Sequence, residues 1–210
     1  MQTTTRNGVA AKEIERTLGV CYKTALRMAH QIKILMSNKK NSSPLTGVIE
    51  ADECFIGGLN KNRHADKKVP ESQGRSTKDK VPVVGVLKRG GEISAHVVDD
   101  TSGKTLKAII DKTVDKDKSI VVTDEWLGYA PLIKEYMHVV INHHQEEFVR
   151  GAFHTNTIEG FWSILKRTIK GTHIHVSKKH LQKYVDEVAF RYMNRKNQDT
   201  MFETTLIHVV

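Results

Sequence analysis

The sequence has few cysteines and no long apolar stretch. Its two cysteines, Cys21 and Cys54, form no CxxC pair, which excludes a disulfide framework and a cysteine-rich zinc site. No apolar run approaches the roughly 18–20 residues that a membrane-spanning helix needs, and the N-terminus has no secretory signal pattern. We therefore expect a soluble, intracellular protein in a reducing compartment.

Positive charge is what the chain has in excess. It holds 33 Lys and Arg against 24 Asp and Glu, a formal net charge of +9 over 210 residues. This length allows one well-cored domain with a small appendage, and 39% hydrophobic residues suffice for a core. The charge favours a polyanionic partner, although composition alone also allows a merely soluble basic protein.

The basic residues are concentrated in two segments. Residues 60–80 hold seven Lys and Arg against three acids, and residues 160–196 hold nine against two. The rest of the chain is close to neutral. This distribution is typical of a protein that binds phosphates with two surfaces.

Residues 8–37 predict two helices with a turn at Gly19. Ile14 and Leu18 lie one turn apart in the first helix, and the second begins near Tyr22. Its apolar face is expected to hold Ala25, Met28, Ala29 and Ile32. Because this second helix is also basic, the pair suggests a helix-turn-helix, with an ordinary helical hairpin as the alternative.

A polar linker precedes a region of short apolar runs that alternate with helical patterns. The order strand, strand, strand, helix, strand, helix, strand, helix predicts a mixed α/β architecture. In such a sheet, functional residues gather at the carboxyl ends of the strands. The expected strands are residues 47–52, 81–87, 92–98, 119–123 and 138–141, and the expected helices are about 103–114, 127–136, 156–170 and 177–194.

Two aspartates follow runs of β-branched residues. Asp52 ends the first strand and Asp124 ends the strand over 119–123, so the two carboxylates meet if these strands are neighbours. Close acids repel unless a cation lies between them, and carboxylate ligands without cysteine favour Mg²⁺ or Mn²⁺. Alternatively, Asp124 caps the following helix. Strand alternation places Glu50 on the face of Asp52, whereas Glu53 points the other way or starts a loop.

A third acid lies in the run HTNTIEGFWSILKR. Glu159, Ser163 and Lys166 line one face of the expected helix, since Lys166 follows Glu159 by two turns. Asn156 and Glu159 also match a capping box, which would be a purely structural role. The two interpretations are compatible, because a capped first turn is a rigid base for a carboxylate.

This run, together with EADECFIGG, VTDEWLGY and SKKHLQKYVDEVAFRYMNR, resembles a group of prokaryotic insertion-sequence transposases over residues 47–196. The resemblance implies a ribonuclease H-like catalytic domain with Asp52, Asp124 and Glu159 as the catalytic, metal-binding triad and Lys166 as the basic residue. Asn156 is the alternative third ligand, since some members have Asn there. The implied cofactor is Mg²⁺ or Mn²⁺, two ions per site, and the implied partner is double-stranded DNA, on which the protein forms a homo-oligomer in the cytoplasm, at the nucleoid.

Members of that group usually carry a zinc ribbon before the helix-turn-helix. Here the sequence begins almost at the helices and has no cysteine pair, so no zinc is expected, and the start is either truncated or dispenses with that module. The expected organisation is a helix-turn-helix segment over 1–38, a linker over 39–46, the catalytic domain over 47–196 and a tail over 197–210.

Basic side chains on both surfaces are the candidates for DNA contact. A structure-selective nuclease of the same fold and a non-catalytic DNA-binding regulator remain as alternatives to a transposase. The candidate DNA-binding residues are Lys23, Arg27, Lys33, Lys61, Lys67, Lys68, Arg167, Lys170, Lys178, Lys179, Arg191 and Arg195.

Overall fold

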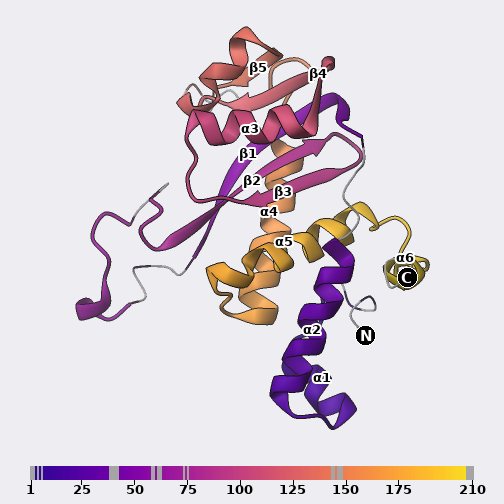
Figure 1. The fold of residues 1–210 in the computed structure, drawn as a ribbon. Coiled ribbons are helices and arrows are strands. Elements are labelled where there is room, and N and C mark those ends of the chain that lie inside the picture. Colours follow the sequence, from indigo (N-terminus) through magenta and orange to yellow (C-terminus); the bar gives the residue numbers. More distant parts are fainter. Residues whose placement is uncertain are drawn as a thin grey trace. The chain divides into compact units, whose positions relative to one another are not determined.

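Two compact units make up the chain (Figure 1). One comprises residues 43–162, and the other combines residues 1–42 with residues 163–210. The computed structural model describes residues 3, 5, 7–37, 43–57, 60, 63–72, 74, 76–142, 145 and 149–206. No helix in these ranges is long and apolar enough to cross a membrane.

The unit of residues 43–162 is built on a five-stranded mixed sheet with the strand order β3-β2-β1-β4-β5. The central strand β1 pairs antiparallel with β2 and parallel with β4, and β4 pairs parallel with β5. This arrangement confirms the expected α/β class and makes the two aspartate-bearing strands neighbours. The strands are β1 (Leu45–Gly57), β2 (Lys80–Lys88), β3 (Ile93–Val97), β4 (Val114–Asp124) and β5 (Met137–Ile141).

Helices cover both faces of this sheet. The helix α3 (Gly103–Thr113) and the 3-10 helix η3 (Leu127–Lys134) bury one apolar cluster, which includes Ile49, Val84 and Val121. The first turns of α4 (Asn156–Thr168) pack on the opposite face, and Figure 1 shows α3 in front of the sheet and α4 behind it. The sheet is therefore buried on both sides, as its almost uninterrupted apolar strand β2 requires.

Two expected elements differ from the structure. Asp52 is not the last residue of its strand, because β1 continues to Gly57 as the antiparallel partner of β2. Only the parallel pairing with β4 stops near Asp52, at Glu50 and Val122. The expected helix after Asp124 is a 3-10 helix, and Pro131 inside it has no N–H to donate to an α-helical bond.

The other unit is helical. The helix α1 (Ala11–Leu18) ends at Gly19 in a left-handed conformation, at φ 65°, and α2 (Tyr22–Ser37) follows. The helix α2 packs on α5 (Lys178–Met193), and its end meets α6 (Met201–Leu206) in a cluster of Met36, Phe190 and Met201. A π-helical turn, η5 (Ile169–His173), lies between α4 and α5 in the sequence.

The buried stripe of α2 contains a charged residue. Its members are Ala25, Ala29, Lys33 and Met36, whereas Met28, expected on this face, is 37% exposed. Lys33 Nζ lies 2.5 Å from Glu187 Oε2 on α5, and Arg191 donates to the other carboxylate oxygen. This corrects the expectation that Lys33 and Arg191 contact DNA, because Glu187 binds both buried cations.

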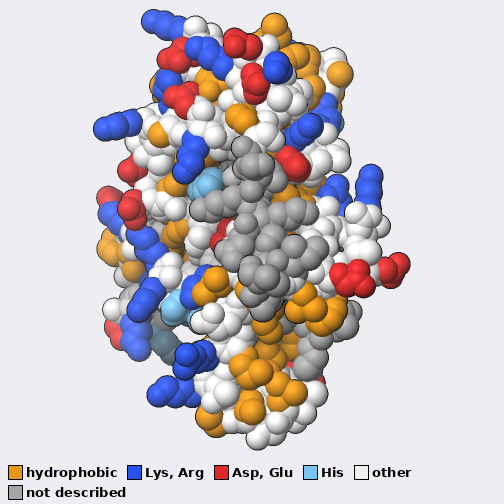
Figure 2. All heavy atoms as spheres, turned by 45° about the vertical axis from the view of Figure 1, so that its right-hand side comes forward, with side chains coloured by type: hydrophobic (Ala, Val, Ile, Leu, Met, Phe, Trp, Pro, Cys, Tyr) orange, Lys and Arg blue, Asp and Glu red, His pale blue; other side chains and the backbone are white. Residues whose placement is uncertain are grey.

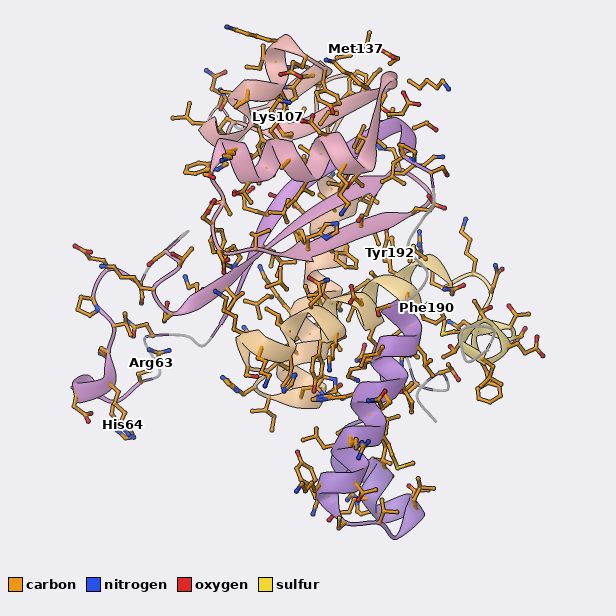
Figure 3. All side chains as sticks on the ribbon, viewed as in Figure 1. Arg63, His64, Lys107, Met137, Phe190 and Tyr192 are labelled. Atoms are coloured by element: carbon orange, nitrogen blue, oxygen red, sulfur yellow. The ribbon has the colours of Figure 1, made fainter. Side chains whose placement is uncertain are left out.

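The segment between β1 and β2 has local order of its own. Asn60 exchanges two hydrogen bonds with the backbone of Val69, and a short 3-10 helix η2 (Ala65–Lys67) lies between them. Arg63 lies 3.5 Å from Asp79, near the start of β2. Figure 3 shows Arg63 and His64 far out on this segment, away from the sheet.

Candidate active site

Three carboxylates meet where the parallel pairing of β1 and β4 ends. One oxygen each from Asp52, Glu53 and Asp124 lies within 4.8 Å of the other two. The register explains this proximity, because Glu50 pairs with Val122 and the two aspartates follow two residues later on each strand. The structure thus brings Asp52 and Asp124 together, as the sequence pattern suggested.

Hydrogen bonds hold both oxygens of Asp52. Oδ1 accepts from the backbone N–H of Glu53 at 2.8 Å, and Oδ2 accepts from Trp162 Nε1 at 2.9 Å. Trp162 lies on α4 and packs over Gly85, the cross-strand partner of Asp52 on β2. A Cβ on Gly85 would lie 2.7 Å from the indole ring, so the glycine makes room for this hydrogen bond.

Glu53 is the member of the cluster that sequence reasoning set aside. Strand alternation sends it to the face opposite Asp52, where the hydroxyl of Tyr129 donates to Glu53 Oε2 at 2.9 Å. Tyr129 is buried in the core of that face. The sequence shows Glu53 directly after Asp52, but it does not show that Asp124 lies beside them. That proximity follows from the pairing of β1 with β4.

Asp124 binds the turn that follows its own strand. Its Oδ1 accepts from the backbone N–H of Trp126 at 3.1 Å. The residue that precedes η3 is Trp126, which makes no side-chain cap bond. Asp124 therefore stabilises the turn and is not the cap of the following helix.

The cluster is electrostatically strained. Burial, followed by the negative charges of Glu53 and Asp124, raises the pKa of Asp52 to about 7. Burial and the same carboxylates raise the pKa of the Tyr129 hydroxyl, which keeps it a hydrogen-bond donor. A cation among these carboxylates would relieve their repulsion.

The donor set fits a hard divalent cation. Every ligand atom in the cluster is a carboxylate oxygen, and no histidine or cysteine joins it among the described residues. Oxygen donors of this kind suit Mg²⁺ and Mn²⁺, whereas structural zinc prefers Cys and His.

The start of α4 carries both candidates for a third ligand. Asn156 is the first residue of the helix, so the capping box expected between Asn156 and Glu159 is not formed. Instead, Thr155 Oγ1 donates to Glu159 Oε1 at 3.1 Å. Asn156 and Glu159 are both exposed, and Glu159 lies outside the three-carboxylate cluster. Lys166 is exposed on the same helix, beyond the boundary between the two units.

The candidate DNA-contacting residues divide by exposure. Lys61 lies outside the described residues, and Lys33 and Arg191 are buried. Around α3 and η3, positive and negative side chains are mixed, as Figure 2 shows at the top of the molecule and the Lys107–Asp111 pair illustrates. The exposed candidates are Lys23, Arg27, Lys67, Lys68, Arg167, Lys170, Lys178, Lys179 and Arg195.

Comparison with known proteins identifies the family of the region that contains the sheet. The family model of the ISXO2-like transposase domain matches residues 44–193. Among curated proteins, none matches the chain. The family match covers the whole sheet, α4 and α5.

Proposed function

Because the chain belongs to the ISXO2-like transposase family, we propose that it cuts DNA at the ends of an insertion sequence and joins those ends to target DNA. Both steps are displacements at phosphorus and can share one metal-dependent site. The observation that carries this proposal is the meeting of Asp52 and Asp124 at the end of the β1–β4 pairing, with Glu53 beside them.

Asp52 and Asp124 would hold Mg²⁺ or Mn²⁺, two ions per site, with Glu159 or Asn156 as the third protein ligand. Bound there, the ions would activate water or a DNA 3′-hydroxyl and stabilise the leaving oxygen. Glu53 is a further candidate ligand, since its carboxylate belongs to the same cluster.

The chain's own residues orient the metal ligands and bind the DNA. Trp162 and the Glu53 N–H fix the carboxylate plane of Asp52, so that its oxygens are aimed before a cation arrives. Lys166 would neutralise a phosphate next to the reacting one, a role that suits a point charge. The exposed basic residues of α2, the β1–β2 segment and α5 would bind further phosphates.

The partner in this proposal is double-stranded DNA, as terminal inverted repeats and as target. The helices α1 and α2, joined at Gly19, would act as a helix-turn-helix over residues 1–38, ahead of a catalytic domain over 47–196. We also propose that the protein assembles as a homo-oligomer on DNA, in the cytoplasm at the nucleoid, because two element ends must be processed together.

A strand-transfer assay with the flanking inverted repeats as substrate tests the proposal. Asp52→Asn and Asp124→Asn should each abolish Mg²⁺-dependent nicking and joining. Glu92→Gln, an exposed acid in the β2–β3 turn, is the matched control and should remain active. Glu159→Gln and Asn156→Ala identify the third ligand, because only the variant that lacks it should lose activity.

The products separate the alternatives. A nuclease of the same fold would give nicked DNA and no joined product. A non-catalytic DNA-binding regulator would bind DNA without any metal-dependent nicking. Activity that persists in both aspartate variants would contradict the proposed site.

A further inference from the structure

Glu50 is a fully buried carboxylate in the middle of the sheet. It precedes Asp52 by two residues on β1 and shares its face, between Leu87 on β2 and Val122 on β4. None of its surface is exposed. A buried carboxylate is costly unless charge and hydrogen bonds compensate it, so the fold must supply partners for both oxygens.

Two of those partners come from the first turn of α4. Glu50 Oε1 accepts from Thr157 Oγ1 at 2.8 Å, and Oε2 accepts from the backbone N–H of Ile158 at 3.0 Å. That N–H is one of the four at a helix start that have no partner within the helix. Glu50 therefore caps α4 from a different element of the fold.

Arg89 completes the arrangement. Its Nε donates to Glu50 Oε1 at 3.0 Å, which compensates the buried negative charge. The same guanidinium donates to the carbonyls of Ala152, at 2.5 Å, and His154, at 3.1 Å. The backbone N–H of Arg89 in turn binds the carbonyl of Val48 on β1. Glu50 and Arg89 together thus tie the start of α4, and the segment before it, to the strand of Asp52.

The residues bound by Glu50 are the two that separate Asn156 from Glu159. Whichever of these is the third metal ligand, it is the immediate neighbour of a residue that Glu50 holds. The other contacts of this helix with the sheet include the packing of Ile158 and Trp162 over Gly85 and, one turn further along, the hydrogen bond from Trp162 to Asp52. Packing is not directional, whereas charge-assisted hydrogen bonds fix both distance and orientation.

We propose that Glu50 is a positioning residue of the transposase site, which with Arg89 fixes the start of α4 relative to Asp52. The inference rests on the proposed function, since it assumes a third ligand on α4. Glu50 does not belong to the cluster of Asp52, Glu53 and Asp124, and its oxygens are already used by α4 and Arg89. It acts through the helix and not on the metal.

The test is Mn²⁺ binding to the full chain, measured by calorimetry without DNA. Glu50→Gln keeps the size of the side chain but replaces an accepting oxygen with a donating NH₂. It should weaken Mn²⁺ binding about ten- to hundredfold, as loss of a group that orients a ligand typically does. Hydrogen exchange at Ile158 should become faster, and Glu92→Gln should change neither quantity.

A stabilised background separates positioning from mere stability. Gly160 lies in α4 with open space at its Cβ position, so Gly160→Ala should stabilise the helix. Glu50→Gln should also lower the melting temperature. In the double variant Glu50→Gln/Gly160→Ala, the melting temperature should return toward the wild-type value while the Mn²⁺ affinity stays low. Recovery of the affinity, or an affinity within about twofold of the wild type in Glu50→Gln alone, would overturn the inference.

The proposed function can fail separately. If the wild type binds Mn²⁺ through Asp52 but neither nicks nor joins DNA, the transposase activity is refuted while the effect of Glu50→Gln still decides the positioning role. If the wild type has no Asp52-dependent Mn²⁺ binding, both are refuted.

Discussion

Trp162 donates a hydrogen bond from its indole Nε1 to Oδ2 of Asp52 over 2.9 Å. The bond joins α4 to the central strand at the point where the parallel sheet pairing ends. It depends on Gly85, because any side chain there would occupy the place of the indole ring. A residue without a side chain thus supports the orientation of a proposed metal ligand.

Gly85→Ala should displace Trp162. The added Cβ would lie 2.7 Å from two ring carbons of Trp162 and 3.1 Å from Ile158 Cδ1. Overpacking of this kind costs about 1–3 kcal/mol of folding free energy. We expect a lower melting temperature and altered fluorescence of Trp162, measured in a Trp126→Phe background.

Gly91→Ala is the matched control for this variant. The Cβ that it adds would lie 3.6 Å from its nearest neighbour, a carbon of Lys88, which is an ordinary contact. The control should leave the fluorescence unchanged. Equal spectra of Gly85→Ala and the wild type would contradict the packing of Trp162 on Gly85.

Asp52→Asn should stabilise the metal-free protein near neutral pH. The pKa of Asp52 is raised to about 7 in the fold from an ordinary value of 3.8. The folded state therefore retains a proton that the unfolded chain releases, and ionisation of Asp52 destabilises the fold as the pH rises from about 4 to 7. Above that range the variant should be more stable by on the order of a few kcal/mol.

Thermal unfolding at about pH 8 and about pH 5 measures this difference. The stability gap should narrow at the lower pH, where Asp52 keeps its proton in the wild type. Added Mg²⁺ should also narrow it, by stabilising the wild type alone. A variant less stable than the wild type at the higher pH would contradict the proposed strain in the cluster.

The sequence predicted that Asp52 and Asp124 meet if their two strands are neighbours, because parallel neighbours end at the same edge of a sheet. The pairing itself came from the structure, since α3 connects β4 to β3, whereas the neighbour of β4 is β1. Local sequence patterns also predicted the helices α3, α4 and α5 to within a few residues of their observed ends. The signal in each case lies within about ten residues of chain.

The partners of Glu50 and Lys33 could not be predicted in this way. Thr157 follows Glu50 by 107 residues, and no periodicity relates a strand residue to the first turn of a distant helix. Lys33 is buried in the core of the helical unit, whereas a lysine on a basic helix is expected at the surface. Only the packing of α2 on α5 brings Glu187 to it.

Glu187→Gln should destabilise the helical unit strongly. Glu187 is the partner of two buried cations, Lys33 and Arg191. Its removal leaves both charges uncompensated, at a cost of about 3–5 kcal/mol. Lys33→Met should cost less, because Glu187 then keeps Arg191 as its partner.

Chemical denaturation followed by circular dichroism measures these changes. The control is Lys12→Met, which breaks an ion pair with Glu15 on the surface and should change stability by at most about 1 kcal/mol. If Glu187→Gln were as mild as this control, Lys33 and Arg191 would not depend on Glu187 for their charge compensation.

His173 should make the helical unit sensitive to acid. Its ring lies edge-on to Tyr184, with 4.6 Å between centroids, beside a cavity of about 430 Å³ that His30, Lys33 and His180 also line. Burial, followed by the charge of Lys33, lowers the pKa of His173 to about 4. The unfolded chain takes up this proton near pH 6.5, so stability is lost as the pH falls from that value toward 4.

His173→Phe should remove most of this dependence, because Phe keeps an aromatic ring against Tyr184 without a titrating group. We expect the wild type to lose about 2 kcal/mol between pH 7 and pH 5 through this residue. Far-ultraviolet circular dichroism follows the helices, and His64→Phe, on the exposed β1–β2 segment, is the control that should keep the wild-type slope. If the stability of His173→Phe fell with pH as steeply as that of the wild type, the acid sensitivity would come from other groups. The dependence attributed to His173 arises because the folded state excludes a proton that the unfolded chain binds at this residue.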